Sequence, residues 1–193
     1  CISTQRIYVH ADIVEEFTAE LVDIAKSVIV GDPSDDGTEV TALIDGDSTE
    51  RVATWISEAV KEGAEIACGG EVGENGILSP TVLTGITPEM KVSCMEVFGP
   101  VVGVATYTDF EEALSRSNDT VYGLQAGVFT NDLSKALRAA DVLDFGGVTI
   151  NEVPSWRADH MPYGGIRDSG NTREGPAYAV KEMTEERLII MQP

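Results

Sequence analysis

Residues 101–150 read VVGVATYTDFEEALSRSNDTVYGLQAGVFTNDLSKALRAADVLDFGGVTI, and this stretch decides the fold class. Apolar runs typical of strands occupy residues 101–107, 125–130 and 148–150. Helices are predicted between them, one starting near Thr108 with Glu111 in capping position and one capped by Asn131. Strands that alternate with helices favour a mostly parallel sheet covered on both faces. We therefore expect an α/β fold, a three-layer α/β/α domain.

The residues before this stretch also begin with a predicted strand that is followed by a predicted helix. Residues 6–9 have the composition of a strand, and apolar side chains then recur at helical spacing over residues 14–24. A loop rich in Gly, Asp, Ser and Pro covers residues 31–47. Asp47 and Glu50 form a capping-box pattern, which predicts a second helix after this loop.

The C-terminal part departs from this alternation. Residues 154–170 contain two prolines and three glycines and follow neither the strand nor the helix period, so they predict a long loop of the kind that often carries function. A short helix is predicted within residues 173–181 and a terminal strand at residues 187–191. Because an exposed apolar strand pairs readily with another chain, we expect residues 1–182 to form the main domain and residues 183–193 an oligomerisation strand.

Composition limits the classes of function. The 193 residues are 42% hydrophobic, which is enough to bury the core of a globular domain. With 33 acidic and 13 basic residues the formal net charge is -20, and such a charge repels nucleic acid. The sequence has no apolar run long enough for a membrane span. We therefore expect small-molecule partners, no nucleic acid and no membrane.

The cysteines are few and scattered. Cys1, Cys68 and Cys94 do not have the number or spacing of a disulfide scaffold or of a metal site. This usage fits a reducing compartment, so a cytoplasmic protein without a bound metal is expected. Cys68 and Cys94 lie among apolar neighbours in the sequence, and we expect both to be buried structural residues.

Four short segments resemble the aldehyde dehydrogenase superfamily. In chain order they are Cys1-Ile2-Ser3-Thr4-Gln5-Arg6, Glu96-Val97-Phe98-Gly99-Pro100, Tyr122-Gly123-Leu124, and Pro162-Tyr163-Gly164-Gly165 followed by Ser169-Gly170. Their separations are also similar to those of the family, and the resemblance covers essentially the whole chain. It implies an oxidoreductase that converts an aldehyde to a carboxylic acid with NAD or NADP as cofactor.

The resemblance makes Cys1 the catalytic nucleophile. A thiol suits this chemistry because sulfur adds readily to an aldehyde, allows hydride to leave, and finally departs as a thiolate from a thioester. The same resemblance places the general base, the oxyanion asparagine and the dinucleotide-binding fold upstream of Cys1. We therefore expect the chain to be a truncated catalytic half that is inactive alone, from a parent enzyme that is a homodimer or homotetramer.

The resemblance also implies a cofactor site. Glu96 corresponds to the carboxylate that accepts hydrogen bonds from the hydroxyls of the nicotinamide ribose, a task for which its two oxygens suit it. Phe98 and Leu124 correspond to residues that pack near the nicotinamide. Met95 is a departure, because many members have a second acid there.

The long loop resembles the substrate-side wall of the family's aldehyde tunnel. Trp156 and Tyr163 would shape this wall, and the sequence of the loop most resembles that of lactaldehyde and phosphonoacetaldehyde dehydrogenases. The planar guanidinium of Arg157 could then bind a carboxylate or phosphonate. Alternatively, Arg157 pairs internally with Asp159 or Glu152.

Two other classes of function remain as alternatives. A cysteine at the first position is also typical of N-terminal-nucleophile hydrolases, in which the amine of Cys1 would act as the base; the alternation of strands and helices opposes their stacked antiparallel sheets. The other alternative is a non-catalytic domain that only oligomerises through its last strand. The presence of Cys1 and Glu96 opposes that interpretation.

Overall fold

A computed structural model describes residues 2–193, so Cys1 lies outside the described residues. The described chain forms two compact units, one of residues 4–116 and one of residues 2–3 and 117–193. The first unit contains β1 (Arg6–His10), α1 (Val14–Ser27), α2 (Gly46–Lys61), β2 (Glu65–Cys68), β3 (Thr81–Thr84), α3 (Lys91–Cys94) and β4 (Val101–Tyr107). The second contains β5 (Gln125–Val128), α5 (Leu133–Val142), β6 (Gly147–Ile150), a 3-10 helix (Arg167–Ser169) and α6 (Pro176–Glu182), while α4 (Phe110–Asn118) is the junction in the chain.

The sheet of the first unit is mostly parallel, as predicted. Its strand order is β1-β4-β3-β2; β4 runs parallel to both β1 and β3, whereas β2 pairs with β3 in the antiparallel sense. The second unit has a separate two-stranded sheet in which β5 and β6 are parallel. Strands β2 and β3, of four residues each, were not predicted.

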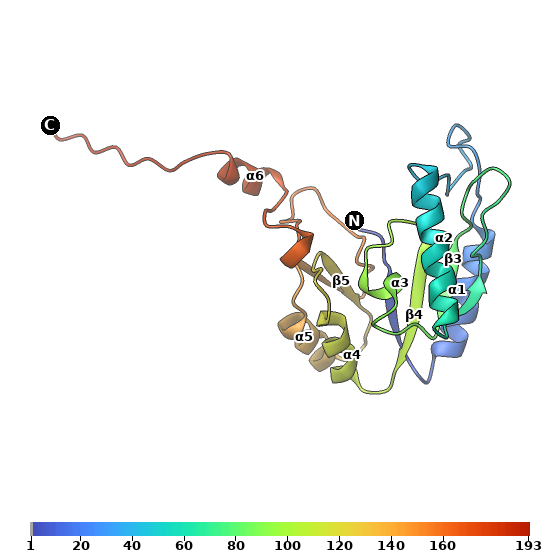
Figure 1. The fold of residues 1–193 in the computed structure, drawn as a ribbon. Helices are drawn as coiled ribbons and strands as arrows, with labels where there is room; N and C mark the ends of the chain where they lie inside the picture. Colours follow the sequence, from blue (N-terminus) through green and yellow to red (C-terminus); the bar gives the residue numbers. More distant parts are fainter. Residues whose placement is uncertain (1) are drawn as a thin grey trace. The chain divides into compact units, whose positions relative to one another are not determined.

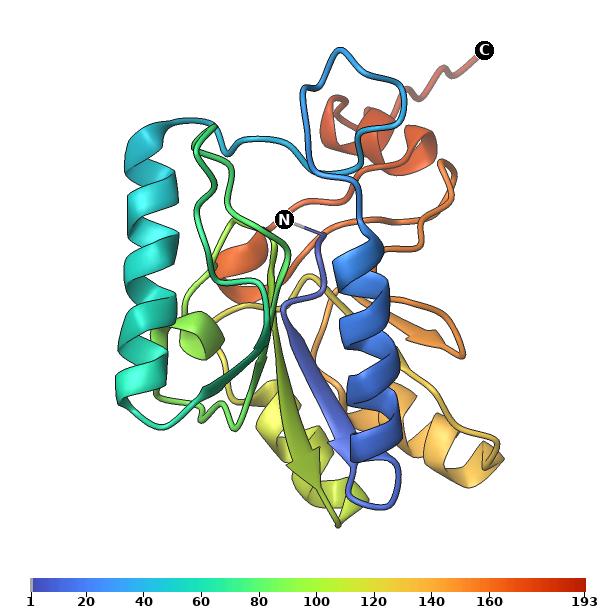
Figure 2. The same cartoon turned by 90° about the vertical axis from the view of Figure 1, so that its right-hand side faces the viewer.

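Helices cover both faces of the four-stranded sheet. On one face Leu83 of β3 packs in a core with Val52 and Ile56 of α2. On the other face Val82 packs in a core with Phe17, a residue of α1. Figure 2 shows the strands lying between these two helices. Adjacent residues of β3 thus face opposite layers, as the two-residue period of a strand requires, and the three-layer prediction holds for this unit.

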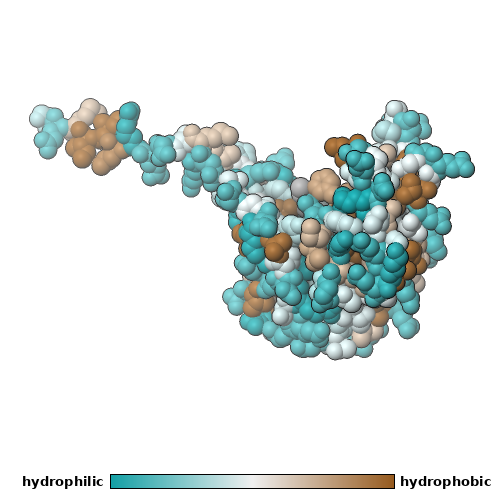
Figure 3. Space-filling model, in the orientation of Figure 1, coloured by the Kyte–Doolittle hydropathy of each residue, from teal (hydrophilic) through white to brown (hydrophobic). Residues whose placement is uncertain are grey.

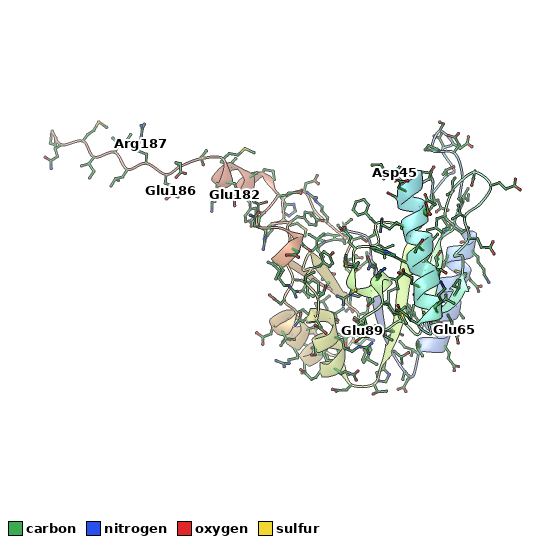
Figure 4. All side chains as sticks on the ribbon, in the orientation of Figure 1. Asp45, Glu65, Glu89, Glu182, Glu186 and Arg187 are labelled. Carbon is green, nitrogen blue, oxygen red and sulfur yellow. The ribbon has the colours of Figure 1, made fainter. Side chains whose placement is uncertain are left out.

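The predicted helices are present, but the predicted caps are wrong by one or two positions. The Asp45 side chain accepts a hydrogen bond from the Ser48 N–H at 2.7 Å and begins α2, in place of Asp47 with Glu50. Figure 4 labels Asp45 at this helix start. Hydrogen bonds from the side chain and backbone of Ser48 lower the pKa of Asp45, so this cap is lost when the pH falls through the pKa of the folded state.

The two later caps are also aspartates. The Asp109 carboxylate accepts from the Glu112 N–H at 3.2 Å near the start of α4, in place of Thr108 with Glu111. For α5 the cap is Asp132, which accepts from the Ser134 N–H at 2.8 Å, in place of Asn131. In each stretch several side chains are able to cap, and the backbone conformation selects one of them.

Two further predictions concern residues 187–191 and the two described cysteines, and of these the one for Cys94 is wrong. Residues 187–191 form no strand within the described chain, and Leu188 and Met191 are 83% and 89% exposed. The reason is that a strand needs a hydrogen-bonded partner, and this segment has none among the described residues. Cys68 is buried as expected, but Cys94 is exposed, because Val92 and Ser93 are the residues of the short α3 that face inward.

None of the helices that the structure describes has the length and apolar character needed to cross a membrane.

Candidate functional site

The segment between α3 and β4 presents Glu96 and Phe98 to solvent. The side chain of Glu96 is exposed, and Phe98 is 60% exposed although it is a large apolar residue. Phe98 also has a positive φ of 54°, which a non-glycine residue adopts only when its surroundings impose it. An exposed aromatic ring on a strained backbone is typical of a ligand-binding position rather than of a packing position.

Side chains from elsewhere in the first unit hold this segment. The Gln5 amide donates to the carbonyl oxygens of Val92 and Met95 at 3.0 and 2.7 Å and accepts from the Val97 N–H at 2.9 Å. The Arg51 guanidinium donates to the Val97 carbonyl oxygen at 2.9 Å. Neither Gln5 nor Arg51 was predicted as a site residue. Both act through hydrogen bonds between segments far apart in the sequence.

In the second unit the structure brings together two of the segments that resemble the family. The Ser169 hydroxyl accepts from the Gly123 N–H at 2.9 Å, and the Gly123 carbonyl accepts from the Ile166 N–H at 3.0 Å. A Cβ at Gly123 would meet the side chain of Ile166 at 2.7 Å, so the close approach requires glycine here. The partly buried Leu124 follows directly and is therefore fixed against the glycine-rich loop.

Arg157 lies in a cluster with Tyr163 and Glu174. The guanidinium stacks 4.2 Å from the centroid of the Tyr163 ring, and its Nη2 donates to the Glu174 carboxylate at 2.7 Å. The internal partner of Arg157 is therefore Glu174, and the alternatives Asp159 and Glu152 were wrong. Glu174 follows Arg157 by seventeen positions, and the spacing of residues along the sequence does not reveal this pair.

The orientation of Arg157 leaves part of its guanidinium available. Its Nε and Nη1 make no hydrogen bond to another of residues 2–193, and its side chain is 36% exposed. Tyr163 beneath it is buried, and its backbone pairs with Glu174 in both directions. Trp156, the other predicted wall residue, is 49% exposed. The cluster thus presents a cation held from two sides beside an exposed aromatic ring.

The structure places all of the predicted site residues except one. Cys1 lies outside the described residues, so its thiol is not placed relative to Glu96 or Arg157. Glu96 and Phe98 belong to one unit, and Leu124, Trp156, Arg157 and Tyr163 belong to the other. Residues 2–193 contain no group of three or more His, Cys, Asp or Glu side chains placed to hold a metal ion.

Comparison with known proteins gives a consistent result. A family model described as the aldehyde dehydrogenase family matches residues 1–189. The chain is 47% identical over 191 residues to 3-sulfolactaldehyde dehydrogenase of Priestia aryabhattai, covering 99% of this chain and 40% of that protein. It is 42% identical to lactaldehyde dehydrogenase of Methanococcus aeolicus, covering 99% and 41%. The crystal structure of aldehyde dehydrogenase 21 from Physcomitrella patens, in complex with the reaction product succinate, superimposes with a TM-score of 0.95 at 38% identity, covering 100% of this chain and 40% of that one.

Proposed function

Because this chain belongs to the aldehyde dehydrogenase family, we propose that it supplies the nucleophile, part of the cofactor site and part of the substrate site of an enzyme that oxidises an aldehyde to a carboxylic acid. The chain spans about 40% of the length of the curated relatives that it matches. The proposal therefore concerns the full-length enzyme. The observation that carries it is the family match over residues 1–189, which includes Cys1, Glu96 and Arg157.

In this proposal Cys1 attacks the aldehyde. The thiolate sulfur bonds to the carbonyl carbon while the C=O π bond breaks, which gives a thiohemiacetal whose oxygen is an alkoxide. The C–H bond of that carbon then breaks with loss of hydride, which leaves a thioester on Cys1. Water adds to the thioester carbon, the C–S bond breaks, and the acid and the thiol are released. NAD or NADP supplies the acceptor for the hydride.

Glu96 and Phe98 have the properties that a nicotinamide ribose site needs. The carboxylate of Glu96 is exposed and offers two acceptor oxygens for two ribose hydroxyls. Phe98, exposed beside it, offers an aromatic surface to a ligand. We propose that both bind the nicotinamide end of the cofactor. For Leu124, packing near the nicotinamide is proposed from the family match alone.

We propose a small anionic aldehyde as substrate. Arg157 is held by Tyr163 and Glu174 but keeps Nε and Nη1 without a partner among the described residues, so it offers a fork of donors to a carboxylate or sulfonate. Trp156 and Tyr163 form the apolar side of the same site. The relatives named for 3-sulfolactaldehyde and sulfoacetaldehyde, which are both sulfonates, support this class of substrate. Lactaldehyde, named for another relative, is a small aldehyde without a charge.

The direct test is to measure NAD(P)H formation by the purified full-length enzyme with a panel of aldehydes. We expect activity with 3-sulfolactaldehyde or lactaldehyde, and we expect kcat/KM for a sulfonated or carboxylated aldehyde to exceed that for a neutral aldehyde of equal length by about tenfold or more. Absence of any aldehyde-dependent NAD(P)H would refute the proposed function. A preference for neutral aldehydes would refute only the substrate class.

We also propose that residues 183–193 form an oligomerisation strand of a homodimer or homotetramer. Figures 1 and 3 show this segment extended, with a cluster of apolar surface that corresponds to Leu188, Ile189, Ile190 and Met191. Backbone pairing with a second copy would cover it. Ile189→Asp in the full-length enzyme should convert the oligomer to monomers in size-exclusion chromatography with light scattering, whereas Glu186→Asp should not. An unchanged mass for Ile189→Asp would exclude this role.

We propose that the full-length protein is cytoplasmic and that its partners are small molecules and not nucleic acid. Cys68 and Cys94 are free thiols, as expected in a reducing compartment. The net charge of -20 opposes binding to polyanions. Localisation of a tagged full-length protein by fluorescence microscopy tests the compartment, and a signal confined to the cell envelope would contradict it.

A further inference from the structure

The amide of Gln5 reaches three backbone groups of the segment that carries Glu96. Its Nε2 donates to the carbonyls of Val92 and Met95, and its Oε1 accepts from the Val97 N–H, with donor–acceptor distances of 2.7 to 3.0 Å. These partners lie 87 to 92 residues away in the sequence. Both amide hydrogens and the carbonyl oxygen are used, so the orientation of this side chain is fixed by its partners.

Arg51 completes the attachment from the opposite side. Its Nη2 donates to the Val97 carbonyl at 2.9 Å, and its guanidinium stacks 4.7 Å from the centroid of the Trp55 ring on the same helix. The N–H and the C=O of Val97 are therefore both held by side chains. Since Val97 itself is 1% exposed, the backbone on either side of it has little freedom to move.

The fixed Val97 lies between the two residues that matter for the cofactor. Glu96 precedes it, and the peptide that joins them carries the N–H held by Gln5. Phe98 follows it with φ at 54°, a strained conformation that persists only where the surrounding structure imposes it. The bonds from Gln5 and Arg51 hold the backbone of the residue that joins Glu96 to Phe98.

Gln5 also lies four residues after Cys1, a span of at most about 14 Å of extended chain. We propose that Gln5 is a positioning residue, which fixes the segment bearing Glu96 to the start of the strand that follows the nucleophile. It thereby sets the direction in which the Glu96 carboxylate meets the nicotinamide ribose. This inference rests on the proposed function and adds a residue that determines cofactor binding without touching the cofactor.

The test is a set of variants of the full-length enzyme. Gln5→Met keeps the length of the side chain and removes all three hydrogen bonds, whereas Gln5→Glu keeps the acceptor for Val97 and loses the two donors. We expect Gln5→Met to raise the KM for NAD(P)+ about tenfold, with the KM for the aldehyde changed less than about twofold. Gln5→Glu should likewise raise the KM for NAD(P)+ and leave the KM for the aldehyde nearly unchanged. Glu96→Gln should raise the KM for NAD(P)+ at least as much as Gln5→Met does.

A cofactor-independent reaction separates positioning from general damage. The Cys1 thiolate should take the acetyl group from p-nitrophenyl acetate and release p-nitrophenolate, and this step needs neither nicotinamide nor Glu96. We expect its rate in Gln5→Met and Gln5→Glu to stay within about twofold of the unmodified enzyme. Thermal unfolding of each variant shows whether it is folded.

Asn118 offers a matched control in the other unit. Its amide also bridges two backbone groups, donating to the Val142 carbonyl at 2.7 Å and accepting from the Asp144 N–H at 2.8 Å, and it is partly buried like Gln5. Asn118→Leu should lower the melting temperature but leave the KM for NAD(P)+ unchanged. If Asn118→Leu raises the KM for NAD(P)+ as much as Gln5→Met does, then the loss of any such amide bridge raises this KM, and the inference is overturned.

The other outcomes separate the inference from the proposed function. If the unmodified enzyme forms no NAD(P)H with any aldehyde, the proposed function and the inference both fail. If the unmodified enzyme is active and both Gln5 variants keep its cofactor KM, or lose the p-nitrophenyl acetate reaction in parallel, only the inference fails.

Discussion

Replacing Cys1 with serine in the full-length enzyme is expected to lower kcat for aldehyde oxidation by about a thousandfold or more. The ordinary pKa of a thiol is about 8.5, so part of it is thiolate near neutral pH, whereas a serine hydroxyl stays protonated and the nucleophile is largely lost. An oxygen ester would also hydrolyse less readily than the thioester. The measurement is steady-state NAD(P)H formation at saturating aldehyde and cofactor.

Cys94 provides the matched control for this substitution. It is an exposed free thiol of the described chain, so Cys94→Ser makes the same chemical change at a different cysteine and should keep kcat within about twofold. Retention of dehydrogenase activity by Cys1→Ser would exclude the thiol mechanism. Labelling Cys1 with iodoacetamide, with and without aldehyde, separates a catalytic thiol, which aldehyde protects, from the thiol of a non-catalytic domain, which it does not protect.

The fold class could be predicted because its signal is periodic. The run Val101–Tyr107 forms the strand β4, which has a parallel partner on each side. Val14, Phe17 and Leu21 lie on the face of α1 that packs against the sheet, whereas Ile24 is exposed. Both patterns follow from local geometry, which repeats every two residues in a strand and every 3.6 in a helix. Such a period survives in a single sequence because each element must bury one face.

The interactions that shape the site could not be predicted because they join distant residues. Gln5 bonds to Val97, 92 positions away, and Arg157 pairs with Glu174, 17 positions away. Any of the 33 acidic residues could in principle have met Arg157, and the sequence offered Asp159 and Glu152 only because they are near. Residue types were therefore informative about chemistry, whereas the partners that orient them depend on the folded chain.

Replacing Arg157 with leucine should reduce kcat/KM for a sulfonated or carboxylated aldehyde by about a hundredfold and for a neutral aldehyde of the same length by less than about threefold. The reason is that charge-assisted hydrogen bonds to the substrate anion contribute roughly 1.5–3 kcal/mol, and only the anionic substrate makes them. Arg157→Lys should recover only part of the loss, because an ammonium lacks the planar fork and the stacking on Tyr163.

The control for Arg157 is Arg138→Leu, which removes one positive charge from the exposed face of α5 and should affect both substrates by less than about twofold. An equal loss for anionic and neutral aldehydes in Arg157→Leu would mean that Arg157 acts only by packing with Tyr163 and Glu174. No loss for either would place the anion at another cation. Only a loss that depends on substrate charge agrees with a guanidinium that Glu174 and Tyr163 hold in place while its remaining donors meet the substrate.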